Sequence, residues 1–296
     1  MTRRTVLGAA STALAVQAQN GPAMYVRFRK GARVAYGTLN GEEVRELTGD
    51  FLKGGKPNGT VHRLKDVKLL APVVPGKVIA IARNYKSHLG TVAPPSRPEM
   101  FYKPTACICG PDDAILLPKD STDVHYEGEL VAVIGKRLKN ATKEQAAAGV
   151  FGVTCGNDVS ERQWQGGPDK DIQWWRAKGS DTFGPLGPYV VAGIDYGKLM
   201  LRTRLNGKVV QEQSTAELIY DVPTMIAFTS KYVTLEPGDV VYTGTPGTTK
   251  KMSPGDVVEV DIEGIGVLRN PIKAEPLTAG QARGQERQQL GRIVRG

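Results

Sequence analysis

The sequence predicts a β-rich α+β protein in which a small N-terminal β domain precedes a larger domain. Short apolar stretches of strand length alternate with turn signals rich in glycine and asparagine along most of the chain. Helical periodicity is sparse, and residues 143–148 and 224–233 are the best candidates for helices. The 296 residues are 40% hydrophobic and 23% charged, which is ordinary for a globular protein with a sizeable core.

The first residues have the pattern of an export signal. Arg3 and Arg4 precede a short run of small apolar residues, and Val16-Gln17-Ala18 places small residues before a cleavage point. Paired arginines are typical of the twin-arginine route, although Val6 stands where a phenylalanine is usual. We therefore expect residues 1–18 to be removed and the protein to be periplasmic or otherwise exported, with a cytoplasmic protein as the alternative. No later apolar stretch is long enough to predict a membrane anchor.

Residues 24–72 are expected to form the small N-terminal β domain. Tyr25–Arg29 alternates between apolar and charged side chains, which indicates a strand. Asn40-Gly41 lies between short apolar segments and is typical of a hairpin turn. Residues 53–59 are rich in glycine and lysine and include a proline, so they predict a loop.

The larger domain is expected over residues 75–273. Lys77–Ala82 and Leu130–Ile134 are apolar runs of strand length, and Asn206-Gly207 predicts another hairpin. Two copies of Pro-Gly-Asp-Val-Val indicate a turn followed by a strand, and no third copy makes them a repeat array. Residues 274–296 are polar and lack an apolar face, so we expect a disordered tail.

Charge and cysteine content narrow the functional classes. The net charge is +9, and part of it lies near the two ends of the chain. The body has no basic run interleaved with aromatic residues, so no nucleic-acid partner is expected. A modest basic excess also suits a small acidic substrate. Cys107, Cys109 and Cys155 are odd in number and lack the spacing of a zinc site, so we interpret them as core residues.

Glu127 and Glu129 are the first candidates for chemistry. Alternate residues of a strand share a face, so this pair shares one with Val131 and Val133. The other face, which includes Leu130, is apolar too, so both carboxylates are expected to point inward or into a cleft mouth. Two close carboxylates need a partner to stay ionised, and Mg²⁺, Mn²⁺ or Ca²⁺ suits their oxygens. An isolated Glu-x-Glu would more often be an exposed strand end.

Asp158 supplies a third oxygen ligand in this interpretation. It follows a strand-like segment, Val150–Cys155, and precedes a helical stretch. An isolated aspartate at such a place more often caps the helix, so capping is the alternative. Beside an inward-facing glutamate pair, the ligand role is favoured. Three carboxylates leave coordination positions for water and substrate, as metal-assisted catalysis requires.

Six short motifs lie between about residues 77 and 272. In chain order they are Ala82–His88, Phe101–Pro104, Tyr126–Leu130, Gly156–Arg162, Lys178–Pro188 and Thr243–Gly247. Together, and in this order, they resemble the fumarylacetoacetate hydrolase superfamily, close to its acylpyruvate-hydrolase-like branch. Each motif is weak alone, but six in the family order are not expected by chance.

The resemblance implies a mixed β-roll or sandwich for the larger domain and a homodimer. It implies metal ligands at Glu127, Glu129 and Asp158, substrate contacts at Arg162, Gln165 and Thr245, and a substrate-facing Lys178. The expected ion is Mg²⁺, with Mn²⁺ or Ca²⁺ as alternatives. The ammonium group of Lys178, placed close to the metal, can stabilise an enolate or carboxylate oxygen.

His88 is the general base that the resemblance implies, because it lies in an Asn-Tyr-x-x-His context that His62 and His125 lack. Hydrolytic members often carry a glutamate three residues after this histidine, on a short helix that closes over the site. Here Thr91 stands at that position, and Pro94-Pro95 argues against a continuing helix. This departure weakens hydrolysis relative to decarboxylation, isomerisation or lyase chemistry.

The expected function is that of a divalent-metal hydrolase that cleaves a C–C bond in a small acidic keto compound of the acylpyruvate or 1,3-diketo acid type. A decarboxylase, isomerase or lyase on the same substrates is one alternative, and a non-catalytic periplasmic ligand-binding protein is another. Glu99 is not expected to replace the missing glutamate. Residues 163–175 contain three tryptophans, which suggests either a lid over an apolar group or a packed surface loop.

Overall fold

The computed structural model describes residues 21–276 and is β-rich with few helices, as the sequence predicts. The export signal expected at residues 1–18 and the tail beyond residue 276 lie outside the described residues. Ala274, which we expected to begin the tail, is instead the last residue of a strand and pairs with Leu117. Among residues 21–276, no helix has the length and apolarity needed to cross a membrane.

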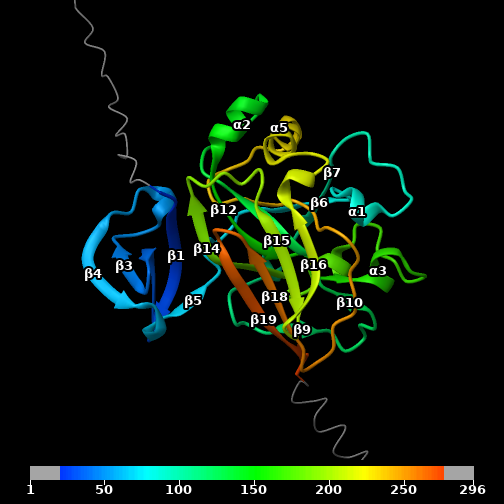
Figure 1. The fold of residues 1–296 in the computed structure, drawn as a ribbon, viewed down its shortest axis with the longest axis horizontal. Helices are drawn as coiled ribbons and strands as arrows, with labels where there is room; N and C mark the ends of the chain where they lie inside the picture. Colours follow the sequence, from blue (N-terminus) through cyan, green and yellow to red (C-terminus); the bar gives the residue numbers. More distant parts are fainter. Residues whose placement is uncertain (1–20, 277–296) are drawn as a thin grey trace, which may run out of the picture.

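The N-terminal strands form a unit at one end of the molecule (Figure 1). They are β1 (Ala23–Lys30), β2 (Arg33–Asn40), β3 (Glu43–Leu47), β4 (Pro57–Arg63) and β5 (Lys68–Leu70). The predicted hairpin joins β2 and β3, with Asn40 paired to Glu43 and Gly41 at a φ of +57°. A positive φ is a backbone conformation that glycine adopts without strain, which explains the residue at this turn.

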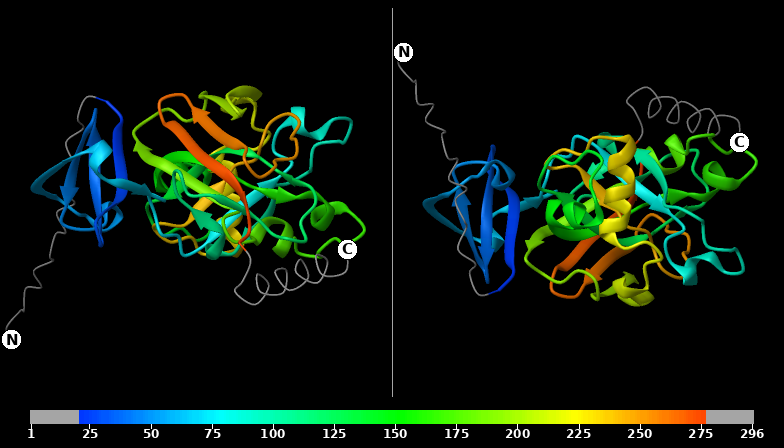
Figure 2. Two further views of the ribbon diagram at one scale, coloured as in Figure 1. Left: turned by 90° about the horizontal axis from the view of Figure 1, so that it is seen from below. Right: turned by 90° about the horizontal axis from the view of Figure 1, so that it is seen from above.

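One long sheet runs through the whole molecule and joins this N-terminal unit to the rest. Its strand order is β4-β3-β2-β1-β14-β12-β11-β17-β6-β7, with β5 on β1 and β8 on β14. Its remaining strands are β6 (Val78–Ala82), β7 (Glu99–Lys103), β8 (Ile108–Cys109), β11 (Gly128–Ile134), β12 (Val150–Asn157), β14 (Gly184–Ala192) and β17 (Val240–Tyr242). The N-terminal unit is therefore attached through backbone pairing of β1 with β14. Figure 2 shows from two further sides that this unit lies at one end of the molecule.

A second sheet packs beside the central strands of the first. Its order is β16 (Lys208–Ser214), β15 (Met200–Leu205), β18 (Val257–Ile262), β19 (Gly266–Ala274) and β9 (Ile115–Leu117), and a separate pair joins β10 (Val124–His125) to β13 (Ser160–Glu161). The helices are α1 (Lys86–Leu89), α2 (Lys143–Gly149), α3 (Arg162–Gly166), α4 (Trp175–Gly179) and α5 (Val222–Tyr232). Helices α2 and α5 correspond to the two predicted helical segments.

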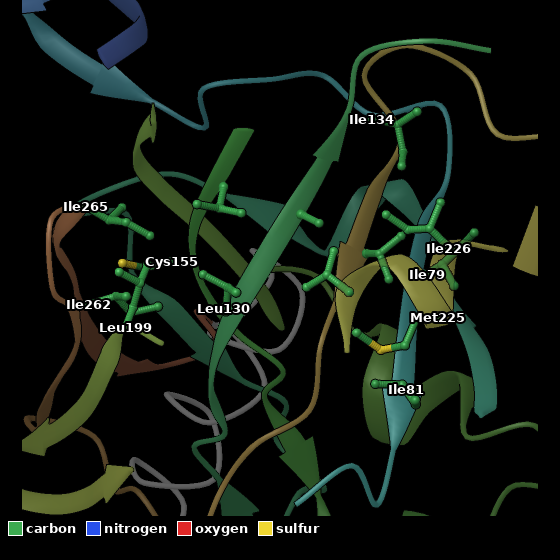
Figure 3. Packing of buried hydrophobic residues seen from close by; sticks show 14 of the residues in the cluster. Ile79, Ile81, Leu130, Ile134, Cys155, Leu199, Met225, Ile226, Ile262 and Ile265 are labelled. Atoms are coloured by element: carbon green, nitrogen blue, oxygen red, sulfur yellow. The ribbon is translucent and has the colours of Figure 1, made fainter. Parts of the chain in front are cut away.

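The main core lies where the long sheet meets the second sheet and α5. Leu130 and Ile134 of β11 belong to the same cluster as Met225 of α5 and Ile262 of β18 (Figure 3). Val131, on the other face of β11, belongs to a separate buried cluster. All seven residues of β11 are buried, so the prediction that both faces of this strand are buried is confirmed. The strand that carries Glu129 is thus held rigidly on both sides.

Glu46 of β3 is a buried charge in the N-terminal unit. It accepts a hydrogen bond from Asn58 Nδ2 at 2.7 Å, contacts His62 Nε2 at 3.0 Å and pairs with Arg33. Burial alone would raise the pKa of the Glu46 carboxyl. Its contacts with His62, Arg33 and Asn58 outweigh burial and lower the pKa to about 2.

We expect the N-terminal unit, which contains Glu46, to become less stable as the pH falls. Because the folded-state pKa of Glu46 lies below its ordinary value of 4.5, its contribution is fully present above about pH 4.5 and is lost as the pH falls toward 2. Glu46→Gln is expected to lower the free energy of unfolding at pH 7 by about 1–3 kcal/mol and to flatten its dependence on pH below 4.5. Urea unfolding at several pH values measures both effects, and an unchanged acid slope in the variant would contradict this account.

Candidate active site

Three carboxylates converge where the neighbouring strands β11 and β12 reach one end. Glu127 immediately precedes β11, Glu129 is its second residue, and Asp158 immediately follows β12. The antiparallel register places Glu129 opposite Gly156, and the Asp158 N–H donates to the Glu127 carbonyl at 2.9 Å. One oxygen from each carboxylate lies within 4.8 Å of the others, and all three residues are buried.

Gly128, between the two glutamates, allows the second sheet to approach this point closely. A Cβ at this position would lie 2.0 Å from the Thr203 hydroxyl oxygen of β15. A larger residue would therefore push the sheets apart beneath the carboxylates. The Glu-Gly-Glu pattern thus combines two inward-facing acids with a close approach of the second sheet at the glycine between them.

Two buried lysines neutralise part of this negative charge. Lys178 Nζ of α4 lies 2.8 Å from Glu127 Oε2 and 2.5 Å from Asp158 Oδ2. Lys103 Nζ of β7 lies 2.5 Å from Asp158 Oδ1 and also donates to the Lys178 carbonyl. Asp158 is therefore held between two ammonium groups, both of them buried.

Asp158 does not cap the helix that follows it. Helix α3 is capped by Glu161, whose carboxylate accepts a hydrogen bond from the Trp164 N–H at 2.7 Å. The capping alternative for Asp158 is therefore wrong, because the two-residue strand β13 separates it from the helix. This leaves the Asp158 carboxylate inside the cluster rather than at a helix end.

Burial and charge push the carboxylates in different directions. Burial, together with the nearby Asp158 and Glu127 charges, raises the pKa of Glu129 well above its ordinary value. For Glu127, burial acts the same way, but Lys178 and Arg162 outweigh it and lower the pKa. Burial lowers the pKa of Lys178, but Asp158 and Glu127 outweigh that effect and raise it. Within residues 21–276, Glu129 is also the one of these three carboxylates that forms no ion pair.

The donor set fits a hard divalent cation. Oxygens that share one Mg²⁺ at about 2.1 Å lie at most about 4.2 Å apart, and those that share Ca²⁺ lie somewhat farther apart. The three carboxylates are already close to this scale, at 4.8 Å or less. A cation would also supply the charge that Glu129 lacks, and carboxylate oxygens are the ligands such ions prefer.

His88, in the short helix α1, has one ring nitrogen fixed. Its Nδ1 lies 2.6 Å from the Gly247 carbonyl oxygen, which only accepts hydrogen bonds, so Nδ1 carries the proton. In the neutral ring the lone pair is then on Nε2, where a base needs it. The half-buried His88 also lines the cavity described next.

A cavity of about 440 Å³ connects most of these groups. It is lined by Ile81, Ala82, Arg83, His88, Glu99, Phe101, Glu127, Glu129, Gln165, Gly166, Trp174, Lys178 and Thr245. Two of the expected site residues, Asp158 and Arg162, are not among these lining residues. Both contact lining residues from behind: Asp158 contacts Lys178, and Arg162 Nη2 lies 2.6 Å from Glu127 Oε1.

Arg162 is itself oriented by neighbours on two sides. It donates to Gln165 Oε1 at 2.6 Å and to the Thr249 hydroxyl at 2.7 Å. Thr245, near the same wall, donates to the Gly128 carbonyl at 3.0 Å. The structure therefore brings the expected substrate-binding residues to one region, with Gln165 and Thr245 on the cavity surface.

The region after His88 differs from a closing helix, as the prolines indicate. Helix α1 ends at Leu89, and Gly90 has a φ of +58°. Glu99 does lie in the cavity wall, which the sequence did not lead us to expect, but its carboxylate is bound by Arg83 at 2.6–2.9 Å. Glu99 is thus occupied, and no contact joins it to His88 among the described residues.

The tryptophans expected to form a lid have three different environments. Trp174 lines the cavity, with its ring centroid 5.4 Å from that of Phe101. Trp164 is buried beneath the Arg176 guanidinium, and Trp175 is 65% exposed. Only Trp174 is therefore placed to contact a bound molecule.

Lys103 and Arg83 are site residues whose roles the sequence did not reveal. Both belong to motifs that carry the resemblance, yet an isolated lysine or arginine is by default a surface residue. One feature of the sequence could have indicated the role of Lys103. It lies in a stretch of strand length before Pro104, and every second side chain of a strand points to the same face.

Residues 77–273 match the family described as fumarylacetoacetate (FAA) hydrolase, C-terminal, which is well over half of the chain. The chain belongs to the fumarylacetoacetate hydrolase family. Residues 24–72 match a second family, described as Rv2993c-like, N-terminal. The fold class expected from the sequence is confirmed by this family membership and by the structural neighbours.

Relatives within the family have several activities. The chain is 48% identical over 249 residues to an uncharacterised protein of Archaeoglobus fulgidus, covering 83% of this chain and 95% of that protein. It is 40% identical to the mitochondrial oxaloacetate tautomerase fahd2 of Xenopus laevis, covering 70% and 69% of the two chains. A 5-carboxymethyl-2-hydroxymuconate delta-isomerase structure from Mycobacterium smegmatis has a TM-score of 0.80 at 41% identity, covering 85% of this chain and all of that one.

A further solved structure in the family contains a metal ion. The maleylpyruvate hydrolase of Sphingobium, in complex with manganese(II) and pyruvate, has a TM-score of 0.70 at 26% identity, covering 86% of this chain and all of that chain. Enzymes of this family that resemble the chain thus include isomerases, a tautomerase and hydrolases that act on keto acids.

The prediction of an exported, periplasmic protein is wrong. The relatives compared here are mostly archaeal, mycobacterial and mitochondrial proteins, and they give an export signal no support. Paired arginines followed by small apolar residues form a short pattern of low information content, which arises readily in a chain start. That is the physical reason for the error.

Proposed function

We propose that this protein is a divalent-metal-dependent enzyme that moves a proton between carbon and oxygen in a small keto acid, as a keto–enol tautomerase or isomerase. The observation that carries the proposal is His88, a base on the cavity wall whose Nδ1–H is held by a backbone carbonyl and not by a carboxylate. A lone base of this kind suits transfer of a proton at the carbon next to a carbonyl group.

The metal would be held by Glu127, Glu129 and Asp158, whose oxygens form a compact hard donor set. When bound, such an ion polarises a carbonyl oxygen as a Lewis acid. The similar maleylpyruvate hydrolase structure, which is in complex with manganese(II) and pyruvate, supports a divalent metal ion as the bound group. Mg²⁺ or Mn²⁺ is the ion we propose, because either one suits an open carboxylate site that keeps positions for substrate.

The protein residues have separate roles in this proposal. Lys178 lies on the cavity wall, and its ammonium group would stabilise the oxygen that becomes negative as the proton leaves carbon. Gln165 and Thr245 would hold the carboxylate beside the keto group, and the hydrogen bond from Arg162 would orient Gln165. His88 Nε2 would take the proton from the carbon next to the keto group and deliver it to the oxygen, or carry it in the reverse direction.

Two observations favour proton transfer over the hydrolysis expected from the sequence. Thr91 stands at the position where the family resemblance leads us to expect the glutamate that hydrolytic members often carry. Glu99, the third carboxylate in the cavity wall beside Glu127 and Glu129, is bound by Arg83. Water at this site would thus lack the paired base that activates it. The tautomerase and the isomerase are also 40% and 41% identical to this chain, whereas the maleylpyruvate hydrolase is 26% identical.

Product analysis in isotopically labelled water tests the proposal. Metal-loaded protein is given an enol of oxaloacetate and, separately, an acylpyruvate. We expect enol absorbance to decay well above the uncatalysed rate, no ¹⁸O in a new carboxylate, and complete loss of activity with a chelator that Mg²⁺ or Mn²⁺ reverses. Incorporation of ¹⁸O with C–C cleavage would establish hydrolysis instead. Tight binding with no turnover, or activity indifferent to chelation, would contradict the proposal.

A further inference from the structure

Arg83 and Glu99 form a charged pair in the cavity wall. This pair is separate from the carboxylate–lysine cluster, which consists of Glu127, Glu129, Asp158, Lys103 and Lys178. Arg83 follows β6 directly, and Glu99 is the first residue of the neighbouring strand β7. Their side chains are 43% and 39% exposed, so a molecule that enters the cavity from solvent can reach them. Neither residue has a role in the proton transfer proposed above.

The backbone of Arg83 is fixed in an uncommon conformation. Its φ is +58°, which a non-glycine residue keeps only when the surrounding structure holds it. The next residue, Asn84, supplies that constraint: its amide donates to the carbonyls of Tyr220 at 3.0 Å and Thr243 at 2.8 Å and accepts from the Tyr220 N–H at 2.8 Å. These hydrogen bonds of the adjacent Asn84 therefore fix the backbone position from which the Arg83 side chain extends.

The guanidinium of Arg83 is only partly used by Glu99. Nε and Nη2 contact the two Glu99 carboxylate oxygens at 2.6–2.9 Å, along one edge of the fork. Nη1 has no hydrogen-bond partner within residues 21–276. A guanidinium has five N–H donors and binds carboxylates in pairs of hydrogen bonds, so this one can hold a further anion.

The other cationic side chain that lines the cavity, Lys178, already forms two ion pairs. Lys178 Nζ contacts both Glu127 and Asp158. The wall also includes the aromatic side chains of Phe101 and Trp174, which offer a carboxylate no positive partner. An anionic group at a distance from the carboxylate–lysine cluster would therefore find its partner at Arg83.

We propose that Arg83 binds a second carboxylate of the substrate, so that the enzyme selects dicarboxylic keto acids, and that Glu99 tunes this selection as a resident counter-ion. The inference rests on the proposed function, which puts the keto acid end of the substrate at the carboxylate–lysine cluster. Two carboxylates on one guanidinium repel each other, so Glu99 weakens the binding that Arg83 provides. A monocarboxylic keto acid leaves the Arg83–Glu99 pair undisturbed.

The test compares oxaloacetate with its 4-methyl ester, which has the same carbon chain and one carboxylate fewer. Dissociation constants are measured by calorimetry on metal-loaded protein, and kcat/KM by enol absorbance, for the wild type, Arg83→Gln and Glu99→Gln. Arg97→Gln is the matched control, because Arg97 is exposed and does not line the cavity. Exposed ion pairs contribute little to stability, so these variants are expected to fold.

We expect the preference for oxaloacetate over the ester to fall at least tenfold in Arg83→Gln, to rise in Glu99→Gln and to stay unchanged in Arg97→Gln. Equal effects of Arg83→Gln on the two compounds would overturn the inference, as would no effect on either. If both compounds bind with the expected pattern but neither is turned over, the proposed function fails and the role of Arg83 stands. Binding of neither compound would overturn both.

Discussion

Replacing Lys103 by methionine is expected to lower the free energy of unfolding by about 3–5 kcal/mol. Lys103 Nζ is buried, lies 2.5 Å from Asp158 Oδ1 and donates to the Lys178 carbonyl. The variant leaves a buried carboxylate with one of its two cationic partners and a buried carbonyl without a donor. Denaturant unfolding measures the loss.

A double-mutant cycle separates the charge pair from packing. Replacing both members, as in Lys103→Met with Asp158→Asn, removes the uncompensated charge, so we expect the double variant to be more stable than Lys103→Met alone. Lys136→Met is the control, since Lys136 is exposed, and it is expected to change stability by less than about 0.5 kcal/mol. A loss below about 1 kcal/mol in Lys103→Met would show that the pair does not hold the site together.

Replacing His88 by glutamine is expected to lower kcat by about 10²–10⁴-fold while metal binding stays intact. His88 is the cavity residue whose Nε2 is left free to take a proton, and glutamine keeps a hydrogen-bond donor for the Gly247 carbonyl without supplying a base. The measurement is the initial rate of enol decay at saturating substrate, with metal content determined on the same sample.

The control for His88 is its neighbour Lys86, which is exposed in the same short helix. Lys86→Ala is expected to change kcat by less than twofold, so a large effect confined to His88→Gln would not come from disturbance of α1. A His88→Gln variant that keeps more than a tenth of the wild-type kcat would assign the proton transfer to another group.

The parts of the fold that depend on local pattern were predictable from the sequence. The apolar run at Leu130–Ile134 indicates a strand buried on both faces, and β11 has that character because a cluster covers each face. Asn206-Gly207 indicates a tight turn, and both residues have positive φ. The pairing of β1 with β14 was not predictable, because residues far apart in the chain decide it.

The carboxylates of the site were predictable from the sequence where strand geometry or a motif places them. Glu127 and Glu129 alternate with apolar residues, so their shared face follows from strand geometry. Asp158 required a choice between ligand and cap, and only the position of Glu161 at the start of α3 decides against the cap. Local sequence does not distinguish these cases, since both residues are acids before the same helix.

The cations of the site were harder to predict because their partners are distant in sequence. Lys103 meets Asp158 across 55 positions, and Arg83 meets Glu99 through the pairing of β6 with β7. Periodicity indicates that a lysine faces inward but not which acid it meets. Only the assembled sheets show that Asp158 is shared by two lysines and that Glu99 is occupied.

The proposed function depends on Glu127, Glu129 and Asp158 together holding one divalent cation. Titration of chelator-treated protein with Mn²⁺, followed by electron paramagnetic resonance, tests it most directly. We expect one tightly bound Mn²⁺ per chain, with an affinity at least about 100-fold weaker in Glu129→Gln and in Asp158→Asn. Wild-type protein that binds no stoichiometric Mn²⁺, or acid-to-amide variants that bind it as tightly as the wild type, would show that these carboxylates are not the metal ligands.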